Sequence, residues 1–235
     1  YHGLAADWLM EQRGDRAVEV SGLIAEHLEM AGRNREAARY MGQAAQLAGA
    51  SYANHQALDY YRRAIALYEA LPEGANRNQA IAQHYERLGD IHGLLQQKAE
   101  ARAAYQLARP HLEASEHIRQ AGLRRKIGDY FDQYSDRRQA YDQAETALGD
   151  EPLEPVYEWW REWLEIQISR MMMFYLYDKT NHIGTMPDRV KPLLEEYGTP
   201  LQQAKFLGFW ARGTTAALVM WYLRRRSVIT VRRSA

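Results

Sequence analysis

The sequence has no cysteine among its 235 residues, which excludes disulfides, iron–sulfur clusters and cysteine-ligated zinc. Its 30 basic and 30 acidic side chains give a formal net charge of zero, whereas proteins that bind nucleic acid or membrane surfaces generally lean basic. No charged and then apolar leader opens the chain, so we expect no signal peptide. The balanced charge predicts no nucleic-acid or membrane partner. The absence of cysteine fits a reducing compartment, and we expect a cytoplasmic location. Because the chain begins at Tyr1 rather than Met, we expect a piece of a longer polypeptide.

Proline is also scarce, with seven residues that fall mostly between segments of helical periodicity. Apolar residues recur three or four positions apart through most of the chain, which predicts a mostly helical protein. Single helices are expected over residues 1–12, 16–30, 35–49, 54–71, 156–178, 187–197 and 201–223, and helix pairs over residues 82–113 and 121–152. Thr199 is expected to cap the last helix, with Pro200 at its first helical position.

The segment 82–113 has a distinct order of small and large residues. Leu88 and Gly89 are followed by Ala101, Tyr105 and Ala108. This order is typical of a tetratricopeptide (TPR) repeat, in which small residues let two helices cross closely while large ones fill the space beside them. We therefore expect Gly89 and Ala101 at a close helix crossing, with Leu88 and Tyr105 packed around it.

The same order recurs along the chain, and one such unit buries its apolar face only by stacking on its neighbours. The matching positions are Ile24, Ala25, Ala37, Met41 and Ala44, then Ala57, Tyr61 and Ala64, then Ile127, Gly128, Ala140, Ala144 and Ala147. We expect an all-α, right-handed TPR-like superhelix of about ten helices. Residues 1–151 would form the repeats, and residues 152–235 would continue the array as further hairpins with a basic C-terminal tail.

Residues 156–178 carry apolar side chains on two faces, which is typical of a helix enclosed between neighbours. One face holds Tyr157, Trp160, Leu164, Ile168, Met171 and Tyr175, and the other holds Trp159, Trp163, Ile166, Met173 and Tyr177. This aromatic helix is also the place where a small-molecule pocket could form.

Three stretches carry a family resemblance: AEHLEMAG with His27, the small-residue run from Ala37 to Ala48, and YAN followed by ALDYYRRAIAL. They resemble the TPR-like arm of bacterial STAND-type signalling ATPases, either those similar to the maltose-regulon activator or those with a class III adenylate/guanylate cyclase domain ahead of the ATPase. The later segment YGTPLQQAKFLGFWA also looks like this group. The resemblance implies ATP in the parent protein, but the chain contains no GxxxxGK[ST] motif and thus no nucleotide site of its own.

No catalytic, cofactor-binding or metal site is expected. No two of the eight histidines have the i, i+4 spacing that places two ligands on one helix face, and His27 is expected to pack or cap. The run Met171 to Met173 is expected in the core rather than in a metal site. The apolar stretch 206–223 contains Arg212, which favours a buried helix over a membrane span. The arginine-rich tail 224–235 is expected to be a solvated end or an interrupted repeat rather than a phosphate-binding site.

One charge pattern predicts a binding surface. If the first helix of each pair lines a concave groove, nine residues point into it, of which seven are acidic and one is basic: Glu19, Glu26, Glu29, Gln83, Glu86, Asp90, Arg125, Asp129 and Asp132. An acidic groove of this kind would receive a basic segment. A solvated face is the alternative interpretation of the same pattern.

These patterns predict a non-catalytic interaction or sensor arm. Its partner would be a protein or peptide, possibly basic, or another domain of the same polypeptide. Binding would be coupled to an ATPase or cyclase domain outside this chain. A small-molecule-sensing solenoid and a free-standing TPR scaffold are the alternatives, and catalysis by this segment itself is not expected.

Overall fold

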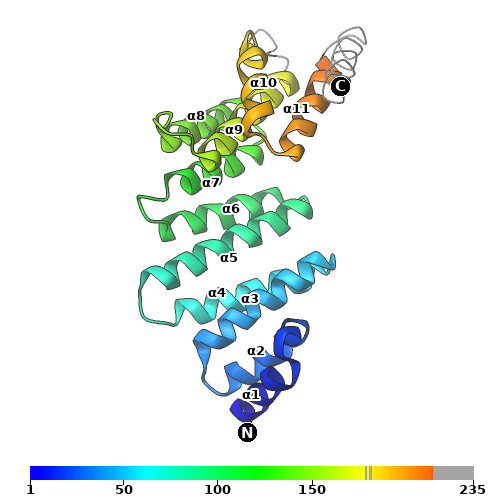
Figure 1. Cartoon of the computed structure of the whole chain (residues 1–235), viewed down its shortest axis with the longest axis vertical. Coiled ribbons are helices and arrows are strands. Elements are labelled where there is room, and N and C mark those ends of the chain that lie inside the picture. Colours follow the sequence, from blue (N-terminus) through cyan, green and yellow to red (C-terminus); the bar gives the residue numbers. More distant parts are fainter. Residues whose placement is uncertain (178, 180–181, 214–235) are drawn as a thin grey trace, which may run out of the picture. The chain divides into compact units, whose positions relative to one another are not determined.

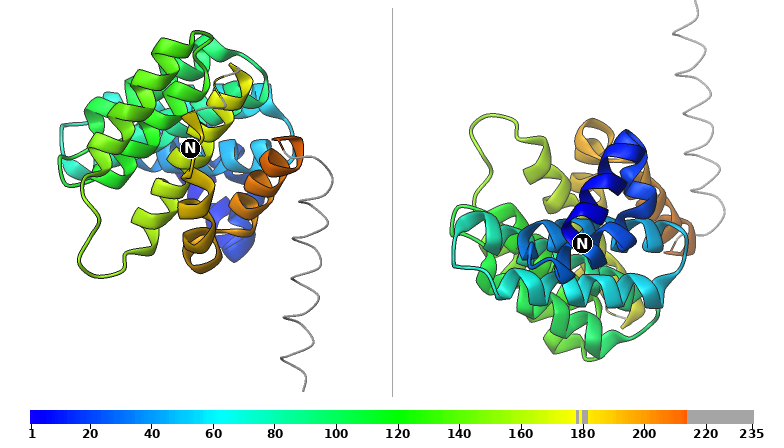
Figure 2. Two further views of the ribbon diagram at one scale, coloured as in Figure 1. Left: turned by 90° about the horizontal axis from the view of Figure 1, so that it is seen from above. Right: turned by 90° about the horizontal axis from the view of Figure 1, so that it is seen from below.

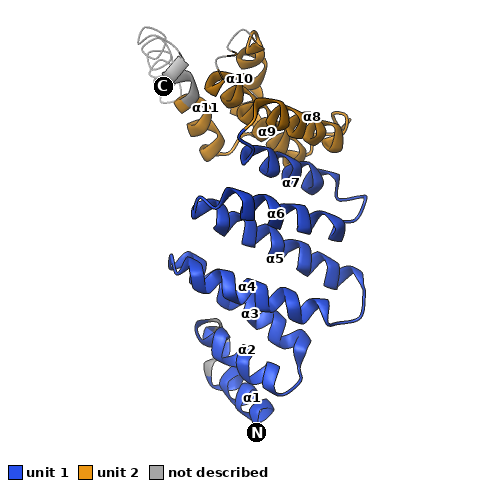
Figure 3. Ribbon diagram, turned by 180° about the vertical axis from the view of Figure 1, so that it is seen from behind, with its two compact units in different colours: residues 1–132 blue, residues 133–235 orange. Residues whose placement is uncertain are grey.

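The computed structural model describes residues 1–177, 179 and 182–213, and within these every regular element is a helix. The chain divides into two compact units, Tyr1–Asp132 and Gln133–Ala235 (Figure 3). The break predicted at residues 151–155 lies inside the second unit, between α8 and α9. A single continuous array stays a prediction.

The first unit contains seven α-helices and two short 3₁₀ segments among its described residues. They are α1 (His2–Arg13), η1 (Gly14–Val20), α2 (Ser21–Met30), α3 (Asn34–Ala50), α4 (Asn54–Glu69), α5 (Ala75–Leu94), α6 (Lys98–Ala108), η2 (Arg109–His111) and α7 (His117–Asp129). Each α-helix packs on the next one in the chain, and the N-terminus lies at one end of the stack (Figure 1; Figure 2, right).

The helix predicted over 16–30 is wrong at its start, because the α-helix begins only at Ser21. Residues 14–20 form a 3₁₀ segment after Gly14, which has a positive φ of 48° and ends α1. The segment contains two β-branched valines, which favour α-helix less than unbranched residues do. The helix pair predicted over 82–113 is also wrong at its start, because α5 begins at Ala75. The other predicted helices of this unit agree with the structure to within a few residues.

The predicted packing of small against large residues is confirmed in α5 and α6. Leu88, Ala101, Tyr105 and Ala108 are all buried, and a Cβ built on Gly89 would lie 2.5 Å from Cε1 of Tyr105. Only a glycine lets these two helices approach so closely. The corresponding residues of α2, α3 and α4 are buried as well.

Contacts between alternate helices divide the first unit into two layers. Arg63 of α4 reaches Glu29 of α2, with 2.6 Å between Nη2 and Oε2. The ring of His84 of α5 lies over Gly42 of α3, where an added Cβ would be 2.6 Å from Cε1. Lys126 of α7 also reaches α5. Helices α2 and α4 therefore share one layer, and α3, α5 and α7 share the other.

Three of the turns in this unit are built alike. After α2, α3 and α5, the chain closes with the two backbone hydrogen bonds of a Schellman motif, at 3.0–3.1 Å and 2.8–2.9 Å. The residue in the left-handed region is Gly32 in the first turn, but Tyr52 and Gln96 in the others, each with φ near 59°. The same local geometry thus recurs without the same amino acid.

The second unit contains α8 (Tyr134–Leu148), α9 (Tyr157–Leu176), α10 (Met186–Tyr197) and α11 (Pro200–Gly213) in its described part. Helix α9 contacts the other three, which confirms the prediction of an enclosed helix. Its aromatic and aliphatic side chains fill this space, since Trp159, Trp160 and Trp163 are buried, as are Met171 and Met173. Met171 and Met173 are therefore core residues, as predicted, whereas Met172 between them is half-buried.

The predicted start of the last helix is also confirmed. The Thr199 hydroxyl accepts a hydrogen bond from the Gln202 backbone N–H at 3.2 Å, and the Gln202 side chain accepts one from the Thr199 N–H at 2.9 Å. This reciprocal pair is a capping box, with Pro200 at the first helical position. The predicted remainder of this helix, 214–223, and the arginine-rich tail lie outside the described residues.

Candidate functional site

The structure places the residues of the predicted acidic groove in separate groups. Glu26 and Glu29 lie on α2, in one layer, while Gln83, Glu86 and Asp90 lie on α5, in the other. Arg125 and Asp129 belong to α7, in the layer of α5, and Glu19 is exposed on η1. The prediction treated α2, α5 and α7 as equivalent helices. Successive helices alternate between the two layers, and two helices lie between α2 and α5 and four between α2 and α7. Helix α2 therefore belongs to the layer opposite that of α5 and α7.

Cations of the same unit already pair with most of these carboxylates. Arg63 lies 3.7 Å from Glu26 and 2.6 Å from Glu29. The other pairs are Lys98 with Asp132 at 2.7 Å and Arg125 with Asp129 at 3.4 Å. The positive charges offset the acidic ones locally, so the surface is less acidic than the nine residues alone indicate. Binding of a basic segment here stays a prediction.

Glu86 and Asp90 belong to a half-buried network that links α5 to α7. The Lys126 ammonium lies 2.9 Å from Glu86 Oε1 and 2.8 Å from Asp90 Oδ1, and Arg119 lies 3.3 Å from Glu86. Burial alone would raise the pKa of Glu86, but Lys126 and Arg119 outweigh it, so the pKa is lowered. Burial likewise acts to lower the pKa of Lys126, and the two carboxylates raise it overall. This network is held in its charged form.

Tyr105 of α6 completes the network from the adjacent helix. Its hydroxyl donates a hydrogen bond of 3.0 Å to Asp90, and the Lys126 ammonium lies 5.3 Å from the centre of its ring. Burial raises the pKa of Tyr105, and the charge of Asp90 raises it further. A tyrosine of this kind stays protonated and serves packing rather than proton transfer.

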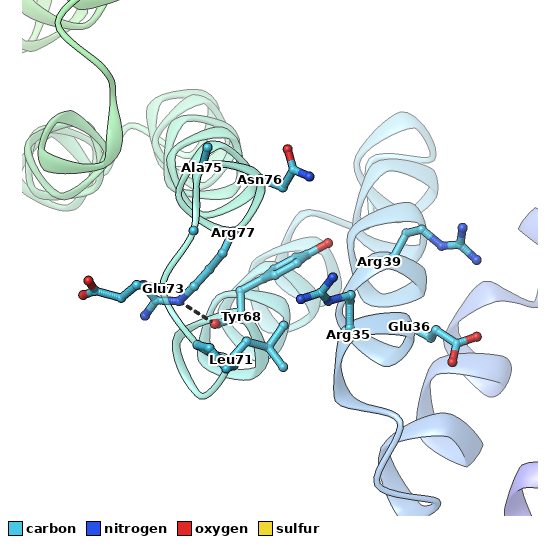
Figure 4. A pocket seen from close by; sticks show the side chains of 11 residues that line it. Arg35, Glu36, Arg39, Tyr68, Leu71, Glu73, Ala75, Asn76 and Arg77 are labelled. Carbon is cyan, nitrogen blue, oxygen red and sulfur yellow. Dashed lines mark hydrogen bonds between the residues drawn. The ribbon is translucent and has the colours of Figure 1, made fainter.

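A second feature of the first unit is a pocket of about 620 Å³ at the junction of α3, α4 and α5 (Figure 4). We call it the basic pocket, and its lining residues are Arg35, Glu36, Arg39, Tyr68, Leu71, Pro72, Glu73, Gly74, Ala75, Asn76 and Arg77. Three arginines and two glutamates line the pocket, and Glu36 is paired with Arg33 at 2.6 Å. No pattern of residue spacing in the sequence indicated this site, because its residues come from three different helices and the loop between α4 and α5.

His27 and His84 each pack against other side chains of the first unit. His2 and His27 lie together, with 2.9 Å between their Nδ1 atoms, so His27 packs against α1 as expected. His84 is buried between Tyr61 and Tyr68, and desolvation lowers its pKa to about 4. In the part of the chain that the structure describes, no group of three or more histidines and carboxylates is arranged to hold a metal ion.

Neither a protein-family model nor a curated protein matches this chain. Among the described residues, no helix is both long enough and apolar enough to cross a membrane.

Proposed function

We propose that this chain is a non-catalytic binding arm of a larger signal-transduction protein, built as a right-handed TPR-like superhelix. The arm would bind a protein or peptide segment and couple that binding to an ATPase or nucleotide cyclase domain elsewhere in the same polypeptide. ATP belongs to that other domain in this proposal, and this chain holds no cofactor.

The observation that carries this proposal is the close packing of Gly89 against Tyr105 at the crossing of α5 and α6. In a TPR hairpin a small residue of the first helix packs against a large residue of the second, as Gly89 packs against Tyr105. The buried alanines of α3 and α4 lie at the corresponding positions of the same order of small and large residues. Stacked hairpins of this type offer an extended surface rather than a closed reaction centre.

The charges of the first unit also favour binding over catalysis. A general acid or base has a pKa tuned towards neutrality and access to its substrate. Glu86 and Lys126 are instead shifted away from neutral pH, and each holds the other in the charged form. Such groups fix one arrangement of α5 and α7.

A partner that binds this arm can change the activity of the parent protein only if it binds one state of the parent more tightly than the other. The decisive experiment starts with the gene around the Tyr1 codon and expresses the entire reading frame. Nucleotide turnover is then compared between the whole protein and a form that lacks residues 1–132. A P-loop in the reading frame together with a several-fold change in turnover supports the proposal. A reading frame with no nucleotide-handling domain contradicts the coupling and favours a free-standing scaffold.

The basic-partner prediction needs variants that leave the fold intact. Charge reversal at Glu86 or Asp90 would disrupt the α5–α7 network, whereas Glu19 and Gln83 are exposed. We expect Glu19→Lys with Gln83→Lys to weaken binding of a fluorescent oligoarginine peptide several-fold, with an oligoglutamate peptide as the control. Equal binding of oligoarginine by the variant and the wild type contradicts this prediction.

A further inference from the structure

His2 of α1 and His27 of α2 face each other across the contact between the two helices. Their Nδ1 atoms lie 2.9 Å apart, and their ring centres lie 5.2 Å apart with 32° between the ring planes. His2 is exposed and His27 is half-buried, so the pair is open to solvent. Among the described residues, no other two histidine rings are in contact. Because the two residues lie 25 positions apart in the chain, no spacing motif in the sequence indicates this pair.

Packing fixes the backbone beneath both rings. Ala6, one turn after His2, is fully buried in one cluster with Leu28 of α2. The start of α1 also lies close to the end of α2, since a Cβ added to Gly3 would be 3.7 Å from the Cβ of Ala31. The two helices therefore hold the histidine rings next to each other before any ligand binds, which lowers the entropic cost of binding.

Two imidazole rings with facing Nδ1 atoms can interact in two ways. With one proton between the two atoms, one ring donates a hydrogen bond to the other. With the proton of each ring on Nε2, both Nδ1 lone pairs are free, and a metal ion accepts two such lone pairs at once. The χ2 torsion of histidine has a broad energy well, so the exposed His2 ring is able to turn its lone pair towards an ion.

The distance between the two nitrogen atoms indicates the class of ion. Imidazole nitrogens lie about 2.0–2.1 Å from a bound transition metal. At this bond length, two neighbouring ligands lie about 2.9 Å apart if they make a right angle at the ion, and about 3.4 Å apart if they make the tetrahedral angle. The observed 2.9 Å matches the right angle. Tetragonal or octahedral Cu²⁺ and Ni²⁺ have this geometry, whereas Zn²⁺ prefers a tetrahedral one.

We propose that His2 and His27 form a binding site for a divalent transition-metal ion, of the class of Cu²⁺ and Ni²⁺, which links α1 to α2. The two Nδ1 atoms occupy neighbouring positions on the ion, and water occupies the others. Since 25 positions separate the ligands, the ion closes a loop that contains all of η1 and stabilises the docked form of α1. The site is independent of the proposed interaction arm.

Isothermal titration calorimetry of the full chain with Ni²⁺, Zn²⁺ and Ca²⁺ tests the class of ion. We expect Ni²⁺ to bind at one site more tightly than Zn²⁺ does. Ca²⁺ prefers oxygen ligands, so we expect no measurable binding of it. Tighter binding of Zn²⁺ than of Ni²⁺ overturns the right-angled geometry. Binding of Ca²⁺ as tight as that of Ni²⁺ overturns the role of the imidazoles.

Variants locate the ion. His2→Gln and His27→Gln each remove one of the two ligands, so we expect each to weaken Ni²⁺ binding about tenfold. His55→Gln is the matched control, because His55 is an exposed histidine on α4. Thermal unfolding without metal confirms that the three variants fold. Unchanged Ni²⁺ binding in His27→Gln overturns the proposal, because the ion is then held without α2, and so does an equal loss in the control.

Hydrogen exchange distinguishes a link between the helices from adventitious binding at the surface. Ni²⁺ should slow amide exchange in α1 of the wild type several-fold and leave exchange in α5 unchanged. In His27→Gln, the same concentration of Ni²⁺ should leave exchange in α1 as it is without the ion. Equal slowing of α1 in both proteins, or no slowing in the wild type, overturns the proposed link.

Discussion

The ring of Tyr105 lies directly across Gly89, and the Tyr105 hydroxyl donates a hydrogen bond to Asp90, the next residue along α5. The ring also stacks on Tyr130, with 6.2 Å between ring centres. Contacts on both sides and at its hydroxyl fix the ring in place. The Gly89 position is therefore a rigid contact rather than a flexible one.

Replacing Gly89 with alanine should destabilise the first unit by about 2 kcal/mol, because the added Cβ overlaps a ring that cannot move aside. Urea unfolding of Gly89→Ala against the wild type measures the effect. Gly208→Ala on α11 is the control, since among the described residues no atom lies within 4 Å of an added Cβ there. In an open helical position alanine should stabilise by up to about 1 kcal/mol. Equal effects at both glycines would contradict the close crossing.

The burial of His84 predicts a loss of stability in mild acid. Its pKa is about 4 in the folded chain and 6.5 when unperturbed, so over this range the unfolded chain binds a proton that the folded chain does not. Stability then falls as the pH drops, by about 1.5 kcal/mol between pH 6.5 and about pH 5. His84→Gln should remove most of this slope in denaturant titrations. The exposed His55, changed to Gln, should leave the slope as in the wild type.

The network around Glu86 predicts a second change at lower pH. Its folded pKa lies below the ordinary value of 4.5, so its contribution to stability is present above that value and is lost as the pH falls through the folded pKa. At neutral pH, Glu86→Gln should cost about 1–2 kcal/mol, less than the loss of a fully buried pair. The difference from the wild type should shrink once Glu86 is protonated. If the difference in free energy of unfolding between Glu86→Gln and the wild type stays constant with pH, the charge of Glu86 is not involved. The exposed Glu19, changed to Gln, serves as the control.

The Schellman turn after α5 offers a stabilising substitution. Gln96 has a φ of 59°, a conformation that costs a non-glycine residue about 1 kcal/mol. Gln96→Gly should raise the melting temperature, and Gly32→Ala, the reverse change in the matching turn after α2, should lower it. Scanning calorimetry measures the melting temperature of both variants. Shifts of the same sign in the two variants would contradict this prediction.

Local signals in the sequence were sufficient for much of the fold. The capping role of Thr199 was predicted from Thr199 and Pro200 alone, and the crossing at Gly89 from its spacing to Ala101, Tyr105 and Ala108. The apolar faces of α9 indicated an enclosed helix because both faces repeat at helical spacing. These features depend on residues that are close in sequence or follow a regular period.

The distribution of charges could not be predicted in this way. Lys126 neutralises Glu86 across 40 positions of the chain, and Arg63 neutralises Glu29 across 34. Which helices share a layer decides such pairs, and the alignment of α2 with α5 missed the intervening α4. The basic pocket was missed for the same reason, since Arg39, Tyr68 and Asn76 line one pocket only after α3, α4 and α5 have packed.

The order of contacts in the first unit has a consequence for how it opens. Helix α1 packs chiefly on α2 and on the 3₁₀ segment that joins them, and its Leu4 and Trp8 remain exposed. Separation of α1 therefore breaks few contacts and leaves α3 to α6 intact. Amide hydrogens should exchange with solvent in a graded sequence, fastest in α1 and slowest in the middle of the stack.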